Sequence, residues 1–98
     1  MADIRFEWDA RKNAQNQRKH GVSFEEAQTV FLDEFALLIA DPDASEQEER
    51  LILLGLSAAA RTLVVCHCVR HEGEVIRIIS ARKANRSERR DYTSRLSR

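Results

Sequence analysis

Residues 50–79 read RLILLGLSAAARTLVVCHCVRHEGEVIRII, and this stretch decides the fold. It contains three runs rich in Leu, Val and Ile, separated by short breaks, at 50–56, 63–69 and 75–79. Runs of this length and composition favour strands, and short connections join neighbouring strands in antiparallel order. The stretch therefore predicts an antiparallel meander of three strands.

The residues before the meander begin with a predicted strand and a polar helix. Ile4, Phe6 and Trp8 alternate with charged residues, which is typical of a half-buried strand. Asp9 is a suitable N-cap and Gly21 a suitable stop for a helix between them. Because the only apolar residues of this helix are two alanines, we expect it to lie at the surface.

The remaining segments predict two more helices and one more strand. Ser23 and Glu26 have capping-box spacing at the start of a helix that runs to about residue 32. Residues 35–40 form an apolar strand candidate, and 84–96, without Gly or Pro, a closing helix. The order β-α-α-β-β-β-β-α predicts an α+β class, with a mostly antiparallel sheet and the helices packed to one side. A chain of 98 residues fits one domain, 1–98.

Charge is balanced over the whole chain but not along it. The 16 basic and 16 acidic residues cancel, yet 25–49 hold nine acids and no base, and 77–98 hold eight Lys or Arg against two acids. Salt screens charges that are more than about 10 Å apart, so the basic part can attract a polyanion although the net charge is zero. Alternatively, the acidic and basic parts neutralise each other in the folded chain. No apolar run approaches the roughly 18 residues of a membrane span, and no signal-peptide core is present. We expect a cytoplasmic protein with no membrane partner.

Residues that often hold cofactors lack the required spacing. Cys66 and Cys68 face one side of their predicted strand and His67 the other, so the three cannot bind one metal ion. The three glycines are scattered at 21, 55 and 73, which excludes a glycine-rich phosphate loop. We therefore expect structural cysteines, no metal and no cofactor.

Arg77 is the first candidate for a functional charge. It interrupts an apolar strand, where a cation needs an anionic partner. That partner is either an internal carboxylate, such as Glu7, Glu49 or Glu74, or a phosphate bound on the face of the sheet. Both alternatives stay open.

Three further residues also have two interpretations each. His20 follows Lys19 and either transfers protons or interacts with the end of its helix. Arg82 either reaches a groove beside the last helix or is a solvated charge. Tyr92 is either a core aromatic or a side chain that stacks on a base.

Several segments together resemble the BrnT toxin family of type II toxin-antitoxin systems. The similarity runs in order from about residue 4 to residue 92. It is carried by Phe6-Glu7-Trp8-Asp9, Lys12, Asn16, KHGVSF at 19–24, Ala27, Val30-Phe31, Glu49-Arg50, RIISARKA at 77–84, Glu88-Arg89-Arg90 and Tyr92.

This resemblance implies a RelE-like fold and a metal-independent ribonuclease that inhibits translation. It also implies a BrnA-type antitoxin partner and binding to operator DNA only through the toxin-antitoxin complex. A homodimer or a heterotetramer is compatible with these properties. The departures from the family pattern lie mainly at 57–62, at 70–74 and after Tyr92.

The resemblance also suggests roles for the candidate residues. Cleaving RNA without a metal needs proton transfer and cations around the phosphate. We assign His20 to proton transfer, Tyr92 to stacking or proton transfer, and Arg77 and Arg82 to the transition-state charge. Five more cations are expected to contact RNA: Lys19, Arg50, Lys83, Arg86 and Arg90.

Two other functions compete with the ribonuclease. One is a catalytically silent RelE-like module that binds an antitoxin and supports operator DNA binding. The other is a scaffold whose arginines all pair with carboxylates. Because the acidic segment 41–49 would repel RNA, we expect it to lie away from the groove of Arg77 and Arg82.

Overall fold

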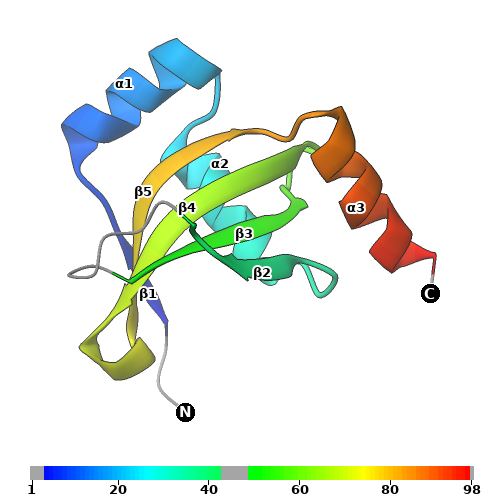
Figure 1. The fold of residues 1–98 in the computed structure, drawn as a ribbon. Coiled ribbons are helices and arrows are strands. Elements are labelled where there is room, and N and C mark those ends of the chain that lie inside the picture. The colour runs from blue at the N-terminus through cyan, green and yellow to red at the C-terminus, as the bar shows by residue number, and fades with distance from the viewer. Residues whose placement is uncertain (1–3, 43–48, 98) are drawn as a thin grey trace.

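The structure, a computed structural model, describes residues 4–42 and 49–97. Within them, one five-stranded sheet has the order β1-β5-β4-β3-β2 (Figure 1). The strands are β1 (Arg5–Glu7), β2 (Leu37–Ala40), β3 (Arg50–Leu56), β4 (Thr62–Arg70) and β5 (Val75–Lys83). The helices are α1 (Ala10–His20), α2 (Phe24–Thr29) and α3 (Arg86–Leu96), with 3-10 turns at Val30–Leu32 and His71–Gly73. The chain order of strands and α-helices agrees with the predicted order.

The predicted meander is confirmed. β3 pairs with β4 and β4 with β5, both antiparallel, and β2 continues the sheet antiparallel to β3. β1 pairs in parallel with β5 at the other edge, so the sheet is mixed. A parallel neighbour needs a long connection rather than a hairpin, and here the chain passes through two helices and three strands between β1 and β5.

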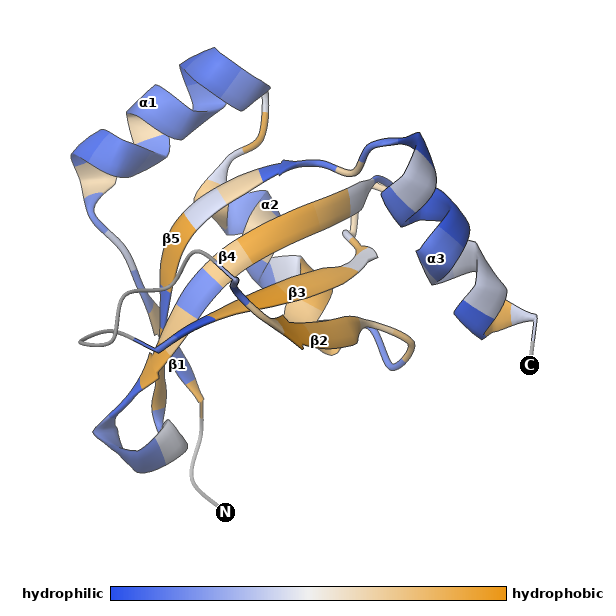
Figure 2. Cartoon of the chain, viewed as in Figure 1, coloured by the Kyte–Doolittle hydropathy of each residue, from blue (hydrophilic) through white to orange (hydrophobic). Residues whose placement is uncertain are grey.

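One face of the sheet carries the larger hydrophobic core. Four buried residues of the α2 region pack there on Leu53, Val65 and Ile78 of the central strands: Val22, Phe24, Ala27 and Val30. Figure 2 shows apolar residues along β3 and β4 and polar residues over most of α1. In the part of the chain that the structure describes, no helix is long and apolar enough to cross a membrane.

The helices do not all pack on one side of the sheet, so that prediction was wrong. Ala84 and Tyr92 belong to a second core cluster with Leu54 and Val64, whose side chains point away from the first core. Side chains alternate along a strand, and β3 and β4 are apolar at consecutive positions, so both faces need cover. α3 covers part of the second face, at the end of the sheet away from α1 (Figure 1).

The helix ends follow from local sequence. The Asp9 carboxylate accepts hydrogen bonds from the first turn of α1, and Gly21 ends that helix in the left-handed conformation with φ 70°. Ser23 accepts from the Glu26 backbone N–H at 3.0 Å, as predicted. The Glu26 carboxylate turns away from this cap and binds Arg61 and Ser57 instead.

Candidate functional site

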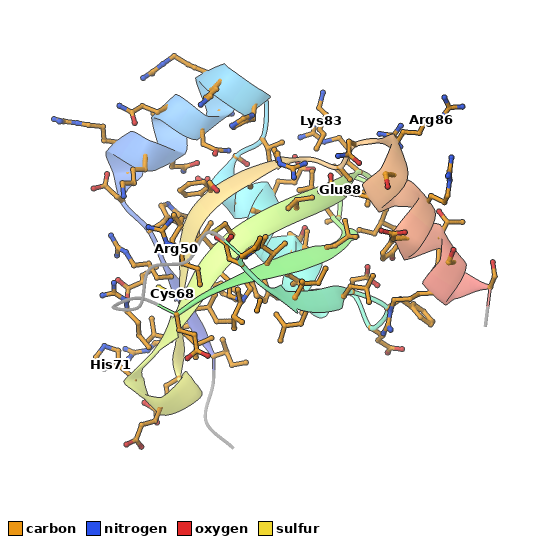
Figure 3. All side chains as sticks on the ribbon, viewed as in Figure 1. Arg50, Cys68, His71, Lys83, Arg86 and Glu88 are labelled. Carbon is orange, nitrogen blue, oxygen red and sulfur yellow. The ribbon has the colours of Figure 1, made fainter. Side chains whose placement is uncertain are left out.

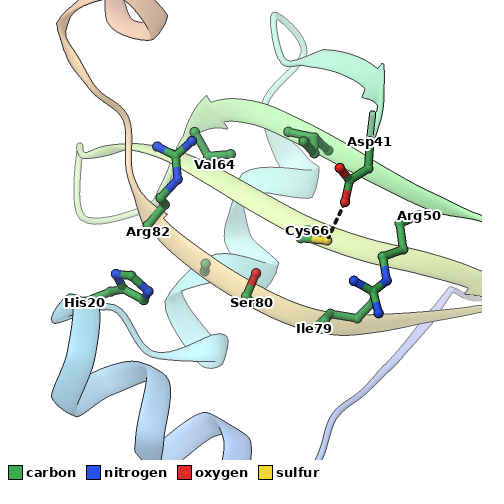
Figure 4. Close-up of a pocket in the computed structure, with 10 residues that line it drawn as sticks. His20, Asp41, Arg50, Val64, Cys66, Ile79, Ser80 and Arg82 are labelled. Atoms are coloured by element: carbon green, nitrogen blue, oxygen red, sulfur yellow. Dashed lines mark hydrogen bonds between the residues drawn. The ribbon is translucent and has the colours of Figure 1, made fainter. Parts of the chain in front are cut away.

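A pocket of about 330 Å³ lies on the second face of the sheet. Figure 4 shows that the C-terminal end of α1, the strands β4 and β5 and the residue after β2 contribute to its wall. Its polar lining consists of His20, Asp41, Arg50, Cys66, Ser80 and Arg82.

The strand register explains why these side chains meet. Cys66 pairs with Ser80, and Arg82 pairs with Val64 two positions back along β4. Arg50 pairs with Cys68 on the other side of β4. Because positions two apart share a face, all of these residues point to the same side of the sheet.

Asn16 fixes the position of His20 against the sheet. The Asn16 amide donates to the carbonyls of Val22 and Ala81, at 2.8 Å each, and accepts from the Ala81 backbone N–H at 3.1 Å. These bonds join α1 to β5 one turn before His20. Asn16 was not a site candidate from the sequence, because its partners become neighbours only in the fold.

Arg82 is held beside the pocket by Glu88. Its two terminal nitrogens donate to the two Glu88 oxygens, each at 2.8 Å. The Glu88 hydrogen bonds raise the pKa of Arg82, and those of Arg82 lower the pKa of Glu88. Glu88 is itself fixed by a capping box with Asn85 at the start of α3. Arg82 therefore reaches the pocket as part of an ion pair, with 44% of its side chain exposed.

Arg77 pairs internally. Its guanidinium donates to Glu7 of β1 at 2.7 Å, which confirms the internal alternative for this residue. Arg77 shares the face of Arg50, since both pair with Cys68 from opposite sides, but it does not line the pocket. The structure thus brings Arg50 and Arg82 together with His20 and places Arg77 outside that group.

Tyr92 lies on the buried face of α3 and does not line the pocket. Its hydroxyl donates to Asp33 at 2.5 Å, and its ring packs in the second core cluster. Burial, and then the hydrogen bond to Asp33, raise the pKa of Tyr92 to about 12. The core alternative is confirmed, and the ring is not available for base stacking at this pocket.

The other predicted RNA contacts divide into two groups. Lys19 lines a second, shallower hollow together with Lys12 and His20, and His20 also lines the first pocket, so the two hollows adjoin. Lys83 and Arg86 point away from the sheet at the start of α3 (Figure 3). Arg90 is likewise exposed on that helix.

Asp41 lines the pocket, so the prediction that segment 41–49 lies away from the groove was wrong at this residue. β2 runs beside β3, and directly after β2 the Asp41 backbone N–H donates to the Arg50 carbonyl at 3.1 Å, which brings the two residues together. The Cys66 thiol donates to the Asp41 carboxylate at 3.6 Å. Residues 43–48 of the acidic segment lie outside the described residues.

The cysteines lie on the strand as predicted. Cys66 and Cys68 share the pocket face of β4, while His67 is buried on the other face against Phe31. Burial, and then Asp41, raise the pKa of Cys66 to about 11, so its thiol is protonated at neutral pH. Among the described residues, no group of three or more His, Cys, Asp or Glu side chains is arranged to hold a metal ion.

These features define an α+β protein with an exposed pocket that is lined by two arginines, a histidine and an aspartate. The family model described as the ribonuclease toxin BrnT of type II toxin-antitoxin systems matches residues 8–88. The chain therefore belongs to the BrnT family of ribonuclease toxins.

A solved structure shares the fold. The crystal structure of the Brucella abortus ribonuclease toxin BrnT superimposes with a TM-score of 0.63 at 22% sequence identity. The match covers 85% of this chain and 99% of that chain. A comparison with curated proteins gives no match.

Proposed function

We propose that this chain acts as a single-domain, metal-independent RNA endonuclease that inhibits translation, with a RelE-like fold and mode of action. Its membership in the BrnT family supports the ribonuclease activity. The observation that carries the proposal is that His20, Arg50 and Arg82 line one pocket, although they come from α1, β3 and β5.

The proposed reaction uses the ribose 2′-hydroxyl as the nucleophile. The 2′-oxygen attacks the phosphorus and loses its proton to a base, and the bond to the 5′-oxygen breaks as that oxygen takes a proton from an acid. The products are a 2′,3′-cyclic phosphate and a 5′-hydroxyl. No redox step or co-reactant is required, so the protein needs to supply only proton transfer, orientation and positive charge.

The pocket residues fit these roles. We assign proton transfer to His20, because histidine is the side chain that most often serves as a general acid or base. Arg50 and Arg82 stabilise the charge on the phosphate oxygens, and Lys19 in the adjoining hollow contacts the next stretch of RNA. Lys83, Arg86 and Arg90 provide an outer attraction for the RNA chain.

Glu88 sets a condition on this mechanism. Because Arg82 already makes two hydrogen bonds to Glu88, a phosphate gains less from Arg82 than from an isolated guanidinium. The ion pair also fixes the Arg82 guanidinium beside the pocket before RNA binds. The side chain therefore loses little further conformational freedom on binding. Arg82 thus contributes position as well as charge.

The test is cleavage of purified RNA by the isolated chain in EDTA. We expect His20→Ala to lower the rate by about 10² to 10⁴ and Arg50→Ala by about 10² to 10³. Arg5→Ala is the matched control, since Arg5 is exposed on β1 and pairs with the start of β5, far from the pocket. Equal rates in all three variants would remove the pocket from the mechanism, and activity restored only by Mg²⁺ would exclude metal independence.

We also propose a BrnA-type antitoxin as the partner, consistent with the type II system named for the family. An antitoxin that covers the pocket would block RNA, and the complex would bind operator DNA as a heterotetramer in the cytoplasm. Purified antitoxin should then inhibit cleavage at a one-to-one ratio. Cleavage that persists with saturating antitoxin would contradict competitive masking.

A catalytically silent module is the second candidate, because the arginine pairs favour it. Arg77 is bound to Glu7 and Arg82 to Glu88, as expected for charges that stabilise the fold. Expression without the antitoxin distinguishes the two functions. Growth arrest that depends on His20 supports the ribonuclease, whereas normal growth with an intact toxin-antitoxin complex supports the silent module.

A further inference from the structure

Asp41 is an acidic side chain in a pocket where cations predominate. Among the described residues of the pocket wall it is the single acid, beside the two arginines Arg50 and Arg82. A carboxylate weakens the attraction between a basic pocket and a phosphate. RNA binding alone therefore gives no reason for Asp41 in this wall, whereas a chemical step that needs a proton acceptor does.

Asp41 is held in place by its backbone and by its side chain. Its backbone N–H donates to the Arg50 carbonyl at 3.1 Å, directly after the end of β2. Its carboxylate reaches across β3 to β4, where Oδ2 accepts from the Cys66 thiol at 3.6 Å. A thiol is a weak donor, and a carboxylate has two oxygens with about four acceptor sites in all. The thiol therefore orients the carboxylate without using its capacity to accept a further proton.

His20 faces the same cavity from the opposite side. Figure 4 shows His20 beside β5 and Asp41 beyond β4, with Ser80 and Cys66 between them. The cavity that both line, of about 330 Å³, has room for a phosphodiester linkage. Two side chains that can transfer protons thus lie on either side of the position expected for the phosphate.

Cleavage by the 2′-hydroxyl needs proton transfer on two sides. The attacking and leaving oxygens lie roughly in line on opposite sides of the phosphorus. A base and an acid each have to come within about 3 Å of one of these oxygens, so one imidazole does not serve both at once. The other titratable groups do not fit the base, because arginine stays protonated and the Cys66 thiol is protonated too, with a pKa of about 11.

We propose that Asp41 is the general base for the 2′-hydroxyl and that His20 is the general acid for the 5′-oxygen. The inference rests on the proposed function, because it divides the proton transfers of that reaction between two residues. The 2′-hydroxyl proton moves to the Asp41 carboxylate as the bond from the 2′-oxygen to phosphorus forms. His20 gives a proton to the 5′-oxygen as the bond from phosphorus to that oxygen breaks. Water then takes the proton from Asp41 and returns one to His20, so both residues regain their starting states.

The first test uses RNA with sulfur in place of the 5′-oxygen at a cleavage position mapped with the unsubstituted chain. Sulfur leaves without a proton from an acid, because thiols are far more acidic than alcohols. We expect His20→Ala and Asp41→Asn each to cut normal RNA about 10² to 10⁴ times more slowly. On the sulfur substrate His20→Ala should regain the rate of the unsubstituted chain, and Asp41→Asn should stay slow. Rescue of Asp41→Asn, or no rescue of His20→Ala, would overturn the assignment.

RNA binding separates a base from a structural carboxylate. Asp41→Asn keeps the size of the side chain and removes its negative charge, so 2′-O-methyl RNA should bind at least as tightly as to the unsubstituted chain. If Asp41 only keeps Arg50 or Cys66 in place, the same variant should bind this RNA more weakly, and that result would contradict the proposal. Asp41→Glu restores a carboxylate and should cut RNA at least tenfold faster than Asp41→Asn.

Glu34→Gln is the matched control. Glu34 is an exposed carboxylate before the start of β2 and does not line the pocket, so this variant should cut both substrates at the normal rate. Circular dichroism verifies that each variant is folded. If the unsubstituted chain cuts neither substrate, the ribonuclease proposal fails and the base assignment fails with it. If it cuts RNA and Asp41→Asn cuts equally fast, the ribonuclease proposal holds and only the base assignment fails.

Discussion

Asn16 is the residue on which the position of α1 depends. It is buried and satisfies the backbone N–H and C=O of Ala81 as well as the Val22 carbonyl. Asn16→Ala leaves these groups buried without a partner, so we expect the free energy of unfolding to fall by about 2 to 3 kcal/mol. Urea unfolding measures this, with the exposed Gln17→Ala as a control that changes it by less than about 0.5 kcal/mol. Equal effects of the two substitutions would show that the Asn16 bonds add no stability.

A substitution of Tyr92 tests whether the second core cluster takes part in RNA cleavage. Tyr92→Phe removes the hydrogen bond to Asp33, which keeps the backbone N–H donors of Leu56 and Phe35. We expect a loss of about 1 kcal/mol in unfolding free energy and an unchanged rate of RNA cleavage. A large loss of cleavage in a stably folded variant would return Tyr92 to the mechanism.

The same tyrosine predicts a loss of stability at high pH. Its pKa is about 12 in the folded chain, because of burial and Asp33, against about 10 when unfolded. The unfolded chain therefore ionises first, and stability decreases as the pH rises from about 10 towards 12. Phenolate absorbance during titration should show this pKa, and a midpoint near 10 in the folded chain would contradict it.

Residue-level prediction from the sequence worked where the partner is local. Asp9, Gly21 and Ser23 occupy the predicted cap positions, since caps depend on the adjacent turn. Asn16 could not be assigned in this way. Its partner Ala81 lies 65 residues away along the chain, and only the packing of α1 against β5 brings the two together.

At the scale of elements, Gly55 determines how closely β3 approaches the segment between α2 and β2. A Cβ atom on Gly55 would lie 2.9 Å from both Val30 Cγ1 and Ala36 Cβ, which is closer than packed carbons tolerate. We expect Gly55→Ala to lower the free energy of unfolding by about 1 to 3 kcal/mol through overpacking. Thermal unfolding measures the effect, and an unchanged midpoint would mean that the segment moves aside freely.

The elements themselves were largely predictable, but their faces were not. Apolar alternation and turn residues give the position of each strand within a few residues. β3 is apolar at consecutive positions, so its sequence does not show which helix packs on the face of Leu53 and which on the face of Leu54. The placement of α3 on the second face depends on how all the elements pack together. It therefore could not be predicted from the sequence of the strands, and we expected the helices on one side only.

For the whole molecule, acid should reduce stability in two ways. Burial lowers the pKa of His67, and arginine hydrogen bonds lower the pKa of Glu26 and Glu88. For all three groups the unfolded chain binds protons more readily, so stability is lost as the pH falls, first below about 6.5 for His67 and then below about 4.5 for the carboxylates. Urea unfolding from pH 7 to pH 3 should show this decrease, and His67→Leu should remove the part above pH 5. A decrease above pH 5 that persists in His67→Leu would assign it to another group.

The distribution of charge over the whole molecule predicts how RNA binding depends on salt. The sequence indicated a basic C-terminal part, but the fold pairs Arg77 with Glu7 and Arg82 with Glu88, so fewer cations are available to phosphates than the sequence suggests. Each single-stranded phosphate neutralised by the protein contributes about −0.7 to the slope of log K against log salt. Arg50→Ala should therefore make the slope shallower by about 0.7, and Arg5→Ala should leave it unchanged. Fluorescence anisotropy with 2′-O-methyl RNA measures binding without cleavage, because the nucleophile is blocked. Equal slopes for Arg50→Ala and the unsubstituted chain would mean that RNA binds on another face, whatever its rate of cleavage.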